Sequence, residues 1–533
     1  DNDGDQDILY SLGGGNGAKP QPARLLKNLL IETQKLAFED VTESSGIADL
    51  GARGRSVRWL DMDQDGDLDF LHITARPAIE QNMPRNILFE NLGTGEFRHR
   101  SSSQFDNIEA ERLLLSDIDN DNRMDLITFS PLNILRQVAD FTFENVSSTW
   151  LPAKLGPVHH VTAATEFDMN NDGLMDVYLA RGKTYYELAN NSIDYTPETL
   201  RLDIRDEGNR SIDGITIYAR DAIKLGKFFR WYRNNDTPFP VFLGAQNTAI
   251  DAPEAPITIN KEMAQGFHFG EASGWYLGHI GNGKWRFAWR LNENLAWGIR
   301  ASIWGVESVE PDWQPESDDI PDILLMNTGT SFDEKSSLLS NITPSNNWGV
   351  IKGDFNNDTF EDLYVYRFGK LNQREADLML LNNRGLSFVP RYRSDATALG
   401  KESHGDMGAA LDYDLDGRVD ILSGDDDQGA WHMFRNLSAA ASENNYLLVN
   451  VPSNQQGTDA QTALVSISLS NGQVLKKRVG SAGEVHSQSN QAIVHFGLGK
   501  AKIVKQLNIH YRDGRHINMS DLAVNQVIYP STH

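Results

Sequence analysis

The stretch Asp61-Met-Asp-Gln-Asp-Gly-Asp-Leu-Asp69, which runs directly into Phe70-Leu-His-Ile-Thr74, decides the fold of this chain. It joins a run of alternating acidic residues to an apolar stretch typical of a β-strand. The same pattern, Asp-x-[Asp/Asn]-x-Asp-x-x-x-Asp, occurs five times, each time before such a strand. The residues at positions 1, 3, 5 and 9 are Asp61, Asp63, Asp65 and Asp69; Asp117, Asp119, Asp121 and Asp125; Asp168, Asn170, Asp172 and Asp176; Asp354, Asn356, Asp358 and Asp362; and Asp412, Asp414, Asp416 and Asp420.

This spacing predicts calcium-binding loops. Ca²⁺ takes roughly six to eight oxygen ligands from carboxylates, amide groups, carbonyls and water. If each loop curls, the side chains at positions 1, 3, 5 and 9 converge, and a glycine at position 6 of three loops permits the bend. We therefore expect about five or more Ca²⁺ ions. The carbonyl at position 7 would complete each shell, from Asp67, Arg123, Leu174, Phe360 and Arg418.

Two other interpretations of the pattern exist. An EF-hand requires a glutamate at position 12, where this chain has His72, Thr128, Leu179, Val365 or Ser423, so the loops are not EF-hands. Solvated turns rich in Asp also occur without metal. Five copies with one spacing favour metal binding over that alternative.

Two incomplete copies extend the repeat. Asp1, Asp3 and Asp7 align with the later part of a loop, so we expect the chain to begin inside a repeat. A decayed copy at Glu316, Asp318 and Asp322 precedes Ile323-Leu-Leu. Seven units result. Three pairs of consecutive copies are separated by 56, 51 and 58 residues (61 to 117, 117 to 168 and 354 to 412), enough for four short strands each, and the long gap after Asp168 must contain an insertion. The sequence therefore predicts an all-β protein with a seven-bladed β-propeller.

A β-rich insertion is expected at residues 195–310, which hold six of the eleven tryptophans. Alternation places Trp285, Phe287 and Trp289 on one face of a strand. An exposed face of this kind could stack on a sugar or receive a protein, so Trp285 and Trp289 are candidate ligand-binding residues. The alternative is a tryptophan-rich core.

The tail at 446–530 has alternating apolar runs that predict a small β-sandwich. Its motifs are Gly480-Ser-Ala-Gly483, Ser487-Gln-Ser489, His495-Phe-Gly-Leu-Gly499 and Tyr511-Arg-Asp-Gly514. With these motifs, residues 444–533 resemble the ASPIC/UnbV domain. The acidic repeats, and turns such as Asn91-Leu-Gly-Thr-Gly-Glu-Phe97, make residues 1–440 similar to the FG-GAP/VCBS propeller repeats of integrin alpha chains, with a truncated first blade. The combination resembles the cartilage acidic protein family and implies a secreted or surface protein.

The resemblance to integrin propellers implies that the strand before each loop is innermost in its blade. Residues upstream of the loops would then ring the opposite mouth of the propeller, where they could bind a ligand. The alternative is ordinary rim residues that are hydrogen-bonded to their neighbours. The candidates are Arg55, Arg112, His159, His160, Trp348, His404 and Asp406.

Composition narrows the function classes. The formal net charge of −25 argues against nucleic-acid binding. The sequence contains no run of 18 apolar residues, so it predicts no membrane-spanning helix. The chain has no cysteine, and weak calcium modules fill only where free calcium is high, so we expect an extracellular, cell-surface or periplasmic location. Three functions stay open: adhesion or binding of an unknown protein or glycan with structural calcium, a polysaccharide-active enzyme, and a subunit of an extracellular assembly. No catalytic residue is predicted.

Overall fold

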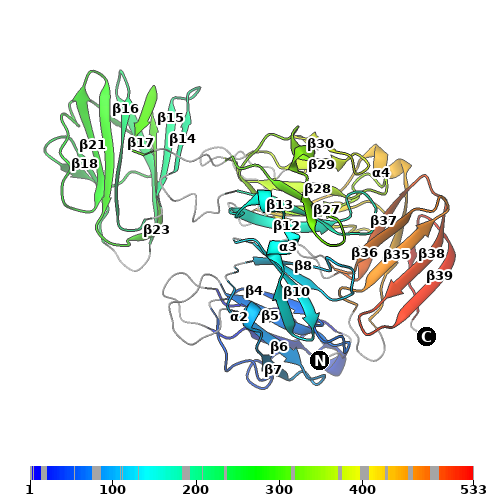
Figure 1. The fold of residues 1–533 in the computed structure, drawn as a ribbon. Coiled ribbons are helices and arrows are strands. Elements are labelled where there is room, and N and C mark those ends of the chain that lie inside the picture. Colours follow the sequence, from blue (N-terminus) through cyan, green and yellow to red (C-terminus); the bar gives the residue numbers. More distant parts are fainter. Residues whose placement is uncertain are drawn as a thin grey trace. The chain divides into compact units, whose positions relative to one another are not determined.

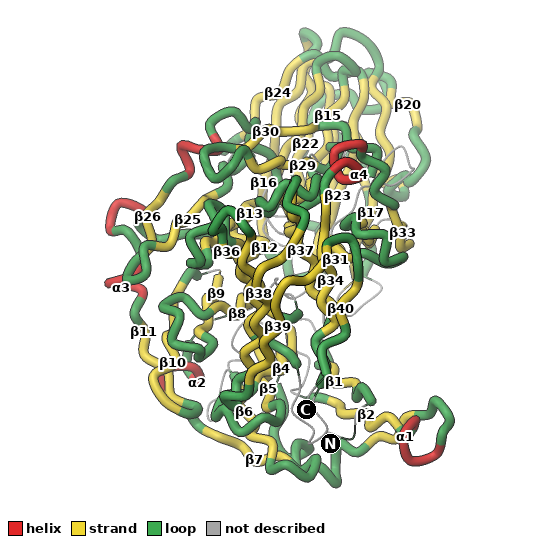
Figure 2. The backbone as a smooth tube through the Cα atoms, turned by 90° about the vertical axis from the view of Figure 1, so that its right-hand side faces the viewer, coloured by secondary structure: helices red, strands yellow, loops and turns green. Residues whose placement is uncertain are grey.

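A computed structural model describes residues 3, 5–13, 21–52, 54–74, 86–108, 110, 112–129, 131–182, 192–206, 208–232, 237–313, 319–369, 375–396, 407–425, 430–453, 460–480 and 491–531. Strands make up most of the regular structure, and the helices are short turns between them (Figure 2). The chain forms two compact units: residues 1–181, 321–368 and 376–533 build the first, and residues 182–320 and 369–375 build the second.

Between residues 8 and 434 the described part of the first unit has six small antiparallel sheets that follow one another along the chain (Figure 1). Four sheets have four strands and two have three. They are β1 (Ile8–Tyr10), β2 (Arg24–Asn28) and β3 (Phe38–Asp40); β4 (Gly54–Leu60), β5 (Asp69–Thr74), β6 (Ile87–Asn91) and β7 (Phe97–Arg100); β8 (Arg112–Ser116), β9 (Asp125–Phe129), β10 (Asn133–Ala139) and β11 (Thr142–Asn145); β12 (Val161–Phe167), β13 (Asp176–Arg181), β25 (Ile323–Asn327) and β26 (Phe332–Glu334); β27 (Asn347–Gly353), β28 (Asp362–Arg367), β29 (Leu378–Asn382) and β30 (Phe388–Arg391); and β31 (Met407–Leu411), β32 (Asp420–Asp425) and β33 (Ala430–Phe434).

The first strands of successive sheets are hydrogen-bonded to one another near their starts. Arg112 of β8 donates to the carbonyl of Thr162 in β12, and the Thr162 hydroxyl donates to the carbonyl of Asn347 in β27 over 2.8 Å. Between the sheets lie apolar layers, such as the one that joins Leu114 and Ile127 to Val177. This arrangement is that of a β-propeller-like fold, in which each sheet buries its faces against its neighbours.

One expected blade is absent from the described residues. The decayed acidic copy should have opened its own sheet at Ile323, but β25 pairs with β13, with Val177 opposite Leu325, and is therefore the third strand of an existing sheet. Asp322 instead accepts hydrogen bonds from the Tyr178 hydroxyl and, over 2.7 Å, from the Asn347 amide. That part of the prediction was wrong, while Glu316 and Asp318 lie outside the described residues.

The C-terminal part of the first unit consists of two sheets around one apolar core that includes Leu447, Ile467 and Phe496. In the larger sheet β38 lies between β35 and β39 (Figure 1). The sheets comprise β34 (Asn445–Asn450), β37 (Ile493–Gly499) and β40 (Val527–Ile528), and β35 (Leu464–Leu469), β36 (Val474–Arg478), β38 (Ile503–His510) and β39 (His516–Ala523). The helices of the first unit are α1 (Leu30–Thr33), α2 (Ser103–Asp106), α3 (Ser147–Trp150), η1 (Ala153–Leu155), η2 (Ser336–Leu339) and α4 (Ala439–Glu443).

The second unit has a five-stranded and a six-stranded sheet. They enclose one core in which Trp275, Trp285 and Trp289 are almost fully buried. The strands are β14 (Ser192–Thr196), β15 (Arg201–Asp206), β23 (Ala296–Trp304), β17 (Ile223–Tyr232) and β20 (Ile257–Ile259), and β19 (Thr248–Ile250), β18 (Val241–Leu243), β21 (Gly274–Gly281), β22 (Lys284–Leu291), β16 (Ser211–Tyr218) and β24 (Ser308–Pro311).

Candidate metal-binding loops

The five complete acidic copies, at 61–69, 117–125, 168–176, 354–362 and 412–420, are called the acidic loops below. Each connects the first and second strands of its sheet. All five share one backbone conformation, because positions 4 and 6 both have positive φ. Asn, Asp and Gly tolerate this region best, and most of these positions carry Asn or Gly. The residues are Gln64, Asn120, Asn171, Asn357 and Leu415 at position 4, and Gly66, Asn122, Gly173, Thr359 and Gly417 at position 6.

Backbone N–H groups orient the acidic side chains inside each loop. In all five loops Oδ2 of the first Asp accepts a hydrogen bond from the N–H at position 6, over 2.7 to 3.2 Å. Oδ1 of the Asp at position 5 accepts one from the N–H at position 7. These bonds hold the carboxylates of positions 1 and 5 in place within each curled loop.

Carboxylate oxygens meet in three of the loops. One oxygen each from positions 1, 3 and 9 lies within 4.8 Å of the others in the sets Asp61, Asp63 and Asp69; Asp117, Asp119 and Asp125; and Asp412, Asp414 and Asp420. In the other two loops position 3 is an amide, from Asn170 or Asn356, which offers a neutral oxygen in place of a carboxylate. Hard oxygen donors at this separation suit Ca²⁺.

Burial disfavours the ionised form of the carboxyl groups at positions 1 and 9 of the loops. Desolvation raises the pKa of Asp69 to about 9 and the pKa values of Asp125 and Asp176 to about 8, although backbone N–H groups act in the opposite direction. Burial raises the pKa of Asp354 to about 7 and that of Asp61 to about 6. A divalent cation among the oxygens would offset this penalty, so the electrostatics of the loops fit the expected ion.

Arginines neutralise part of the loop at 412–420. Burial acts to raise the pKa of Asp416, but hydrogen bonds from Arg418 and Arg435 outweigh it and lower the pKa. Arg435 also lies 2.9 Å from an oxygen of Asp414. This loop therefore needs less charge from a cation than the loop at 61–69.

The Asp at position 9 also links three strands. Its Oδ2 accepts a hydrogen bond from the backbone N–H of position 2. Its Oδ1 accepts a hydrogen bond from the backbone N–H of a residue in or just beyond the third strand of the sheet. Sequence reasoning missed these third-strand residues as part of the site. They are Asn91, Gln137, Asn327, Asn382 and Asn436.

The side chains of four third-strand residues reach the preceding sheet. Asn382 Nδ2 donates to the carbonyl of Met169 over 2.9 Å, and Asn327 Nδ2 donates to the carbonyl of Ile118 over 2.8 Å. The side-chain amides of Gln137 and Asn436 likewise donate to the carbonyls of Met62 and Phe355, respectively. In each case the acceptor is position 2 of the preceding loop. For Asn327 and Asn382 the signal in the sequence is an Asn before a glycine-containing turn, which by itself indicates only a hairpin; Gln137 and Asn436 precede no such turn.

Neighbouring acidic loops are hydrogen-bonded in a row. The side-chain amide at position 4 donates to the carbonyl at position 6 of the next loop: Gln64 to Asn122, Asn120 to Gly173, Asn171 to Thr359 and Asn357 to Gly417, over 2.8 to 3.2 Å. The loops at 168–176 and 354–362 are therefore direct neighbours, although the whole second unit separates them in sequence.

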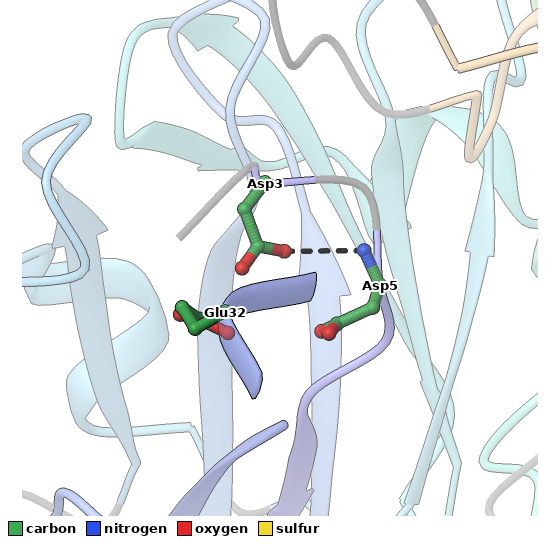
Figure 3. A group of neighbouring side chains, drawn as sticks. All are labelled: Asp3, Asp5 and Glu32. Atoms are coloured by element: carbon green, nitrogen blue, oxygen red, sulfur yellow. Dashed lines mark hydrogen bonds between the residues drawn. The ribbon is translucent and has the colours of Figure 1, made fainter. Parts of the chain in front are cut away.

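The N-terminal partial copy also forms an acidic cluster. Asp3, Asp5 and Glu32 face one another in Figure 3, with Asp5 N–H donating to Asp3 Oδ1 over 3.1 Å. Asp7 Oδ1 accepts the N–H of Asn28, as position 9 does in the complete loops. Asp5 and Glu32 were not among the predicted ligands, and Asp1 lies outside the described residues.

The predicted mouth residues have mixed environments. Arg112 is buried and hydrogen-bonded to Thr162, and Trp348 stacks on Phe368 with ring centroids 4.2 Å apart. These two contacts agree with the alternative interpretation, packing within the fold. His159 is exposed and His160 half-buried, with ring centroids 6.4 Å apart; Arg55 is half-buried; His404 and Asp406 lie outside the described residues.

Trp285 and Trp289 are core residues. Both are completely buried. The indole N–H of Trp285 donates to the carbonyl of Ala219, and that of Trp289 donates to Asp206 Oδ2 over 2.9 Å. Side chains with no exposed face cannot stack on a ligand. The prediction of a ligand-binding aromatic face was therefore wrong for these residues, and the alternative of a tryptophan-rich core describes them.

Comparison with protein families agrees with the repeats and the tail. Residues 117–179 match an FG-GAP-like repeat, and residues 451–529 match the ASPIC and UnbV family. No curated protein matched the chain. Within the described residues, no helix is long and apolar enough to cross a membrane.

Proposed function

Since the chain carries an FG-GAP-like repeat and a C-terminal ASPIC and UnbV domain, we propose that it is a calcium-stabilised β-propeller protein that binds a protein or glycan partner outside the cytoplasm. Five loops with positive φ at the same two positions, three of which gather carboxylate oxygens from positions 1, 3 and 9, carry the proposal. Its blades would be the six sheets of residues 8–434, with the insertion and the C-terminal β-sandwich as separate domains.

Each acidic loop would hold one ion. The side chains at positions 1, 3, 5 and 9 and the carbonyl at position 7 are the proposed ligands, with about one or two waters completing the shell. Bound calcium would supply positive charge where burial now raises the pKa of the carboxyl groups. The surrounding N–H donors orient the carboxylates before the ion arrives, which reduces the entropy lost on binding.

A structural role for the ions is favoured over a catalytic one. A catalytic metal keeps an open position for substrate, whereas these loops provide at least five protein oxygens each. The loops are also hydrogen-bonded to their neighbours and to the third strands, so a change in one loop disturbs the contacts between sheets.

A binding role is favoured over polysaccharide turnover. Among the described mouth residues, Arg112 and Trp348 are occupied by contacts within the protein. No specific observation favours the enzyme. Membership of an extracellular assembly is a form of the binding role and is tested with it.

The decisive experiment is calcium titration of the purified chain by isothermal calorimetry after treatment with a chelator. We expect about five binding events, because five loops share the ligand pattern. Asp125→Asn should remove one of them, whereas the matched variant Asp521→Asn, at an exposed residue paired with Lys505, should remove none. Absence of binding at millimolar calcium would refute the proposal. Glycan and protein arrays probed in calcium and in chelator would then identify the partner class.

A further inference from the structure

The C-terminal domain, residues 445–531, touches the acidic loops through β36, β37 and the turn after β38. Arg512 Nη1 donates to the carbonyl of Asn122 over 2.9 Å, and the N–H of Gly499 donates to the carbonyl of Asn357 over 2.8 Å. His495 Nε2 lies 3.1 Å from the carbonyl of Gly417. Three of the five loops are therefore contacted through their backbone.

Two of these carbonyls are shared between the domain and a neighbouring loop. The carbonyl of Asn122 accepts from Arg512 and also from Gln64, and the carbonyl of Gly417 is contacted by His495 and by Asn357. Both carbonyls belong to position 6, whose positive φ is part of the curled conformation. The domain thus recognises the same loop conformation that gathers the proposed calcium ligands.

Buried ion pairs join the domain to the acidic side chains themselves. Arg478 pairs with Asp117, and the two side chains are only 6% and 1% exposed. Lys477 Nζ lies 3.0 Å from Glu361, the residue at position 8 of its loop. Separating the domain from the loops would break both pairs. Asp117 would lose Arg478, and Glu361 would keep Lys352, 3.7 Å away, but lose Lys477. Loss of a buried partner is unfavourable unless water or a cation replaces it.

A glycine of the domain approaches a loop too closely for a side chain. A Cβ atom at Gly497 would lie 2.0 Å from Asp354 Oδ2, and the displaced atom would be a proposed ligand oxygen. Docking and the position of the first Asp in this loop are therefore mutually constrained. The contact depends on shape alone and involves no charge on the domain side.

We propose that the C-terminal domain is an internal partner of the acidic loops and docks on their calcium-bound conformation, so that calcium binding and docking strengthen each other. The inference rests on the calcium binding proposed above. It gives the domain the role of closing and stiffening the calcium-loop side of the propeller, and it couples loops that share no ligand. Coupling of this kind is reciprocal: what undocks the domain must weaken calcium binding.

Hydrogen exchange of the full chain, followed by mass spectrometry, tests the inference directly. With calcium, amides in 491–515 and in the loops at 117–125 and 354–362 should be protected. When chelator is added at a temperature below unfolding, all three segments should lose protection together, while the second unit keeps its protection. Loss of protection in the loops alone, with 491–515 unchanged, would overturn the inference.

Two variants test the coupling across the domain, each measured at the loop that it does not touch. Gly497→Ala adds a methyl group against the loop at 354–362 and is measured at 117–125; Arg512→Met removes the contact to Asn122 and is measured at 354–362. In both cases the calcium concentration that half-protects the distant loop should rise about five-fold or more. The controls are Gly472→Asn, in an open turn with positive φ, and Arg515→Met, whose side chain pairs with Asp513.

The outcomes separate the inference from the proposed function. If the wild-type chain binds no calcium, the proposed function fails and the inference fails with it. If calcium binds but each variant changes only the loop that it touches, the inference alone fails. If Arg512→Met instead tightens calcium binding, the arginine acts only as a competing positive charge, and the inference is likewise overturned. The wild-type exchange experiment stays decisive even if a variant does not fold.

Discussion

The two units of the molecule are both built from β-sheets but are stabilised in different ways. The first unit places carboxylates, amides and backbone carbonyls at the joints between its sheets, as in the bonds that link Asn171 to Thr359 and Asn382 to Met169. The second unit encloses one apolar core around Trp275, Trp285 and Trp289. Within its described residues, no group of three acidic or histidine side chains gathers as in the acidic loops. The difference teaches that one chain can join its sheets through polar groups in one unit and through a single apolar core in the other.

Chelation should produce the largest difference in thermal stability between the two units. We expect EGTA to lower the melting temperature of the first unit by about 10 °C or more, because several ions that bind only the folded state are withdrawn. The second unit should melt at an unchanged temperature, since its core contains no such loops. Differential scanning calorimetry with and without calcium measures both transitions. Equal shifts in the two units would break the comparison.

The pH dependence of the calcium-free first unit should also be unusual. Folding raises the pKa of Asp69 to about 9 and of Asp125 and Asp176 to about 8, so the folded state binds more protons than the unfolded state above pH 4. Stability in EGTA should therefore fall as pH rises from about 4 to 9. Calcium should abolish most of this slope, because it replaces the protons. Melting curves in chelator that are flat across this range would show that the carboxylates are ionised without an ion.

A substitution in the core of the second unit should destabilise that unit without affecting the first. Trp289→Ala should reduce the free energy of unfolding of that unit by about 3 to 5 kcal/mol, through the cavity and the lost bond to Asp206. Calcium binding by the first unit should not change. Ile212→Ala, at a residue 58% exposed in the same unit, is the control and should have little effect. Denaturant titration followed by tryptophan fluorescence gives the comparison; a parallel loss of calcium affinity would contradict it.

A smaller loss of stability is expected when a side-chain amide that hydrogen-bonds to the preceding sheet is removed from the first unit. Asn382→Ala leaves the carbonyls of Met169 and Glu361 without this donor, at a cost of about 1 to 3 kcal/mol. The adjacent Asn383→Ala should cost less, because its exposed side chain donates to the nearby Ser387 hydroxyl within the same turn. Chemical denaturation in saturating calcium measures both variants. Equal destabilisation would mean that the link between sheets contributes little.

Much of the first unit could be predicted because its information is local. The spacing of Asp117, Asp119 and Asp125 places three carboxylates in one curled loop, and the structure brings their oxygens together. The FG-GAP-like repeat and the ASPIC and UnbV domain can likewise be identified from motifs. The prediction that the decayed copy opens its own blade was wrong, because an acidic residue before an apolar strand does not specify which strand it pairs with. Asp322 precedes β25, whose partner β13 lies on the other side of the second unit in sequence.

The sequence by itself determined the all-β class, the repeat and the loops in which carboxylates gather, because these depend on residue spacing over a few positions. Only the tertiary structure decided which loops are neighbours, that Trp285 and Trp289 are enclosed in a core, and that Arg478 and Arg512 reach the acidic loops. Alternation along a strand defines two faces but does not say which one is covered. Contacts between residues hundreds of positions apart depend on how whole sheets pack, and no local pattern records that.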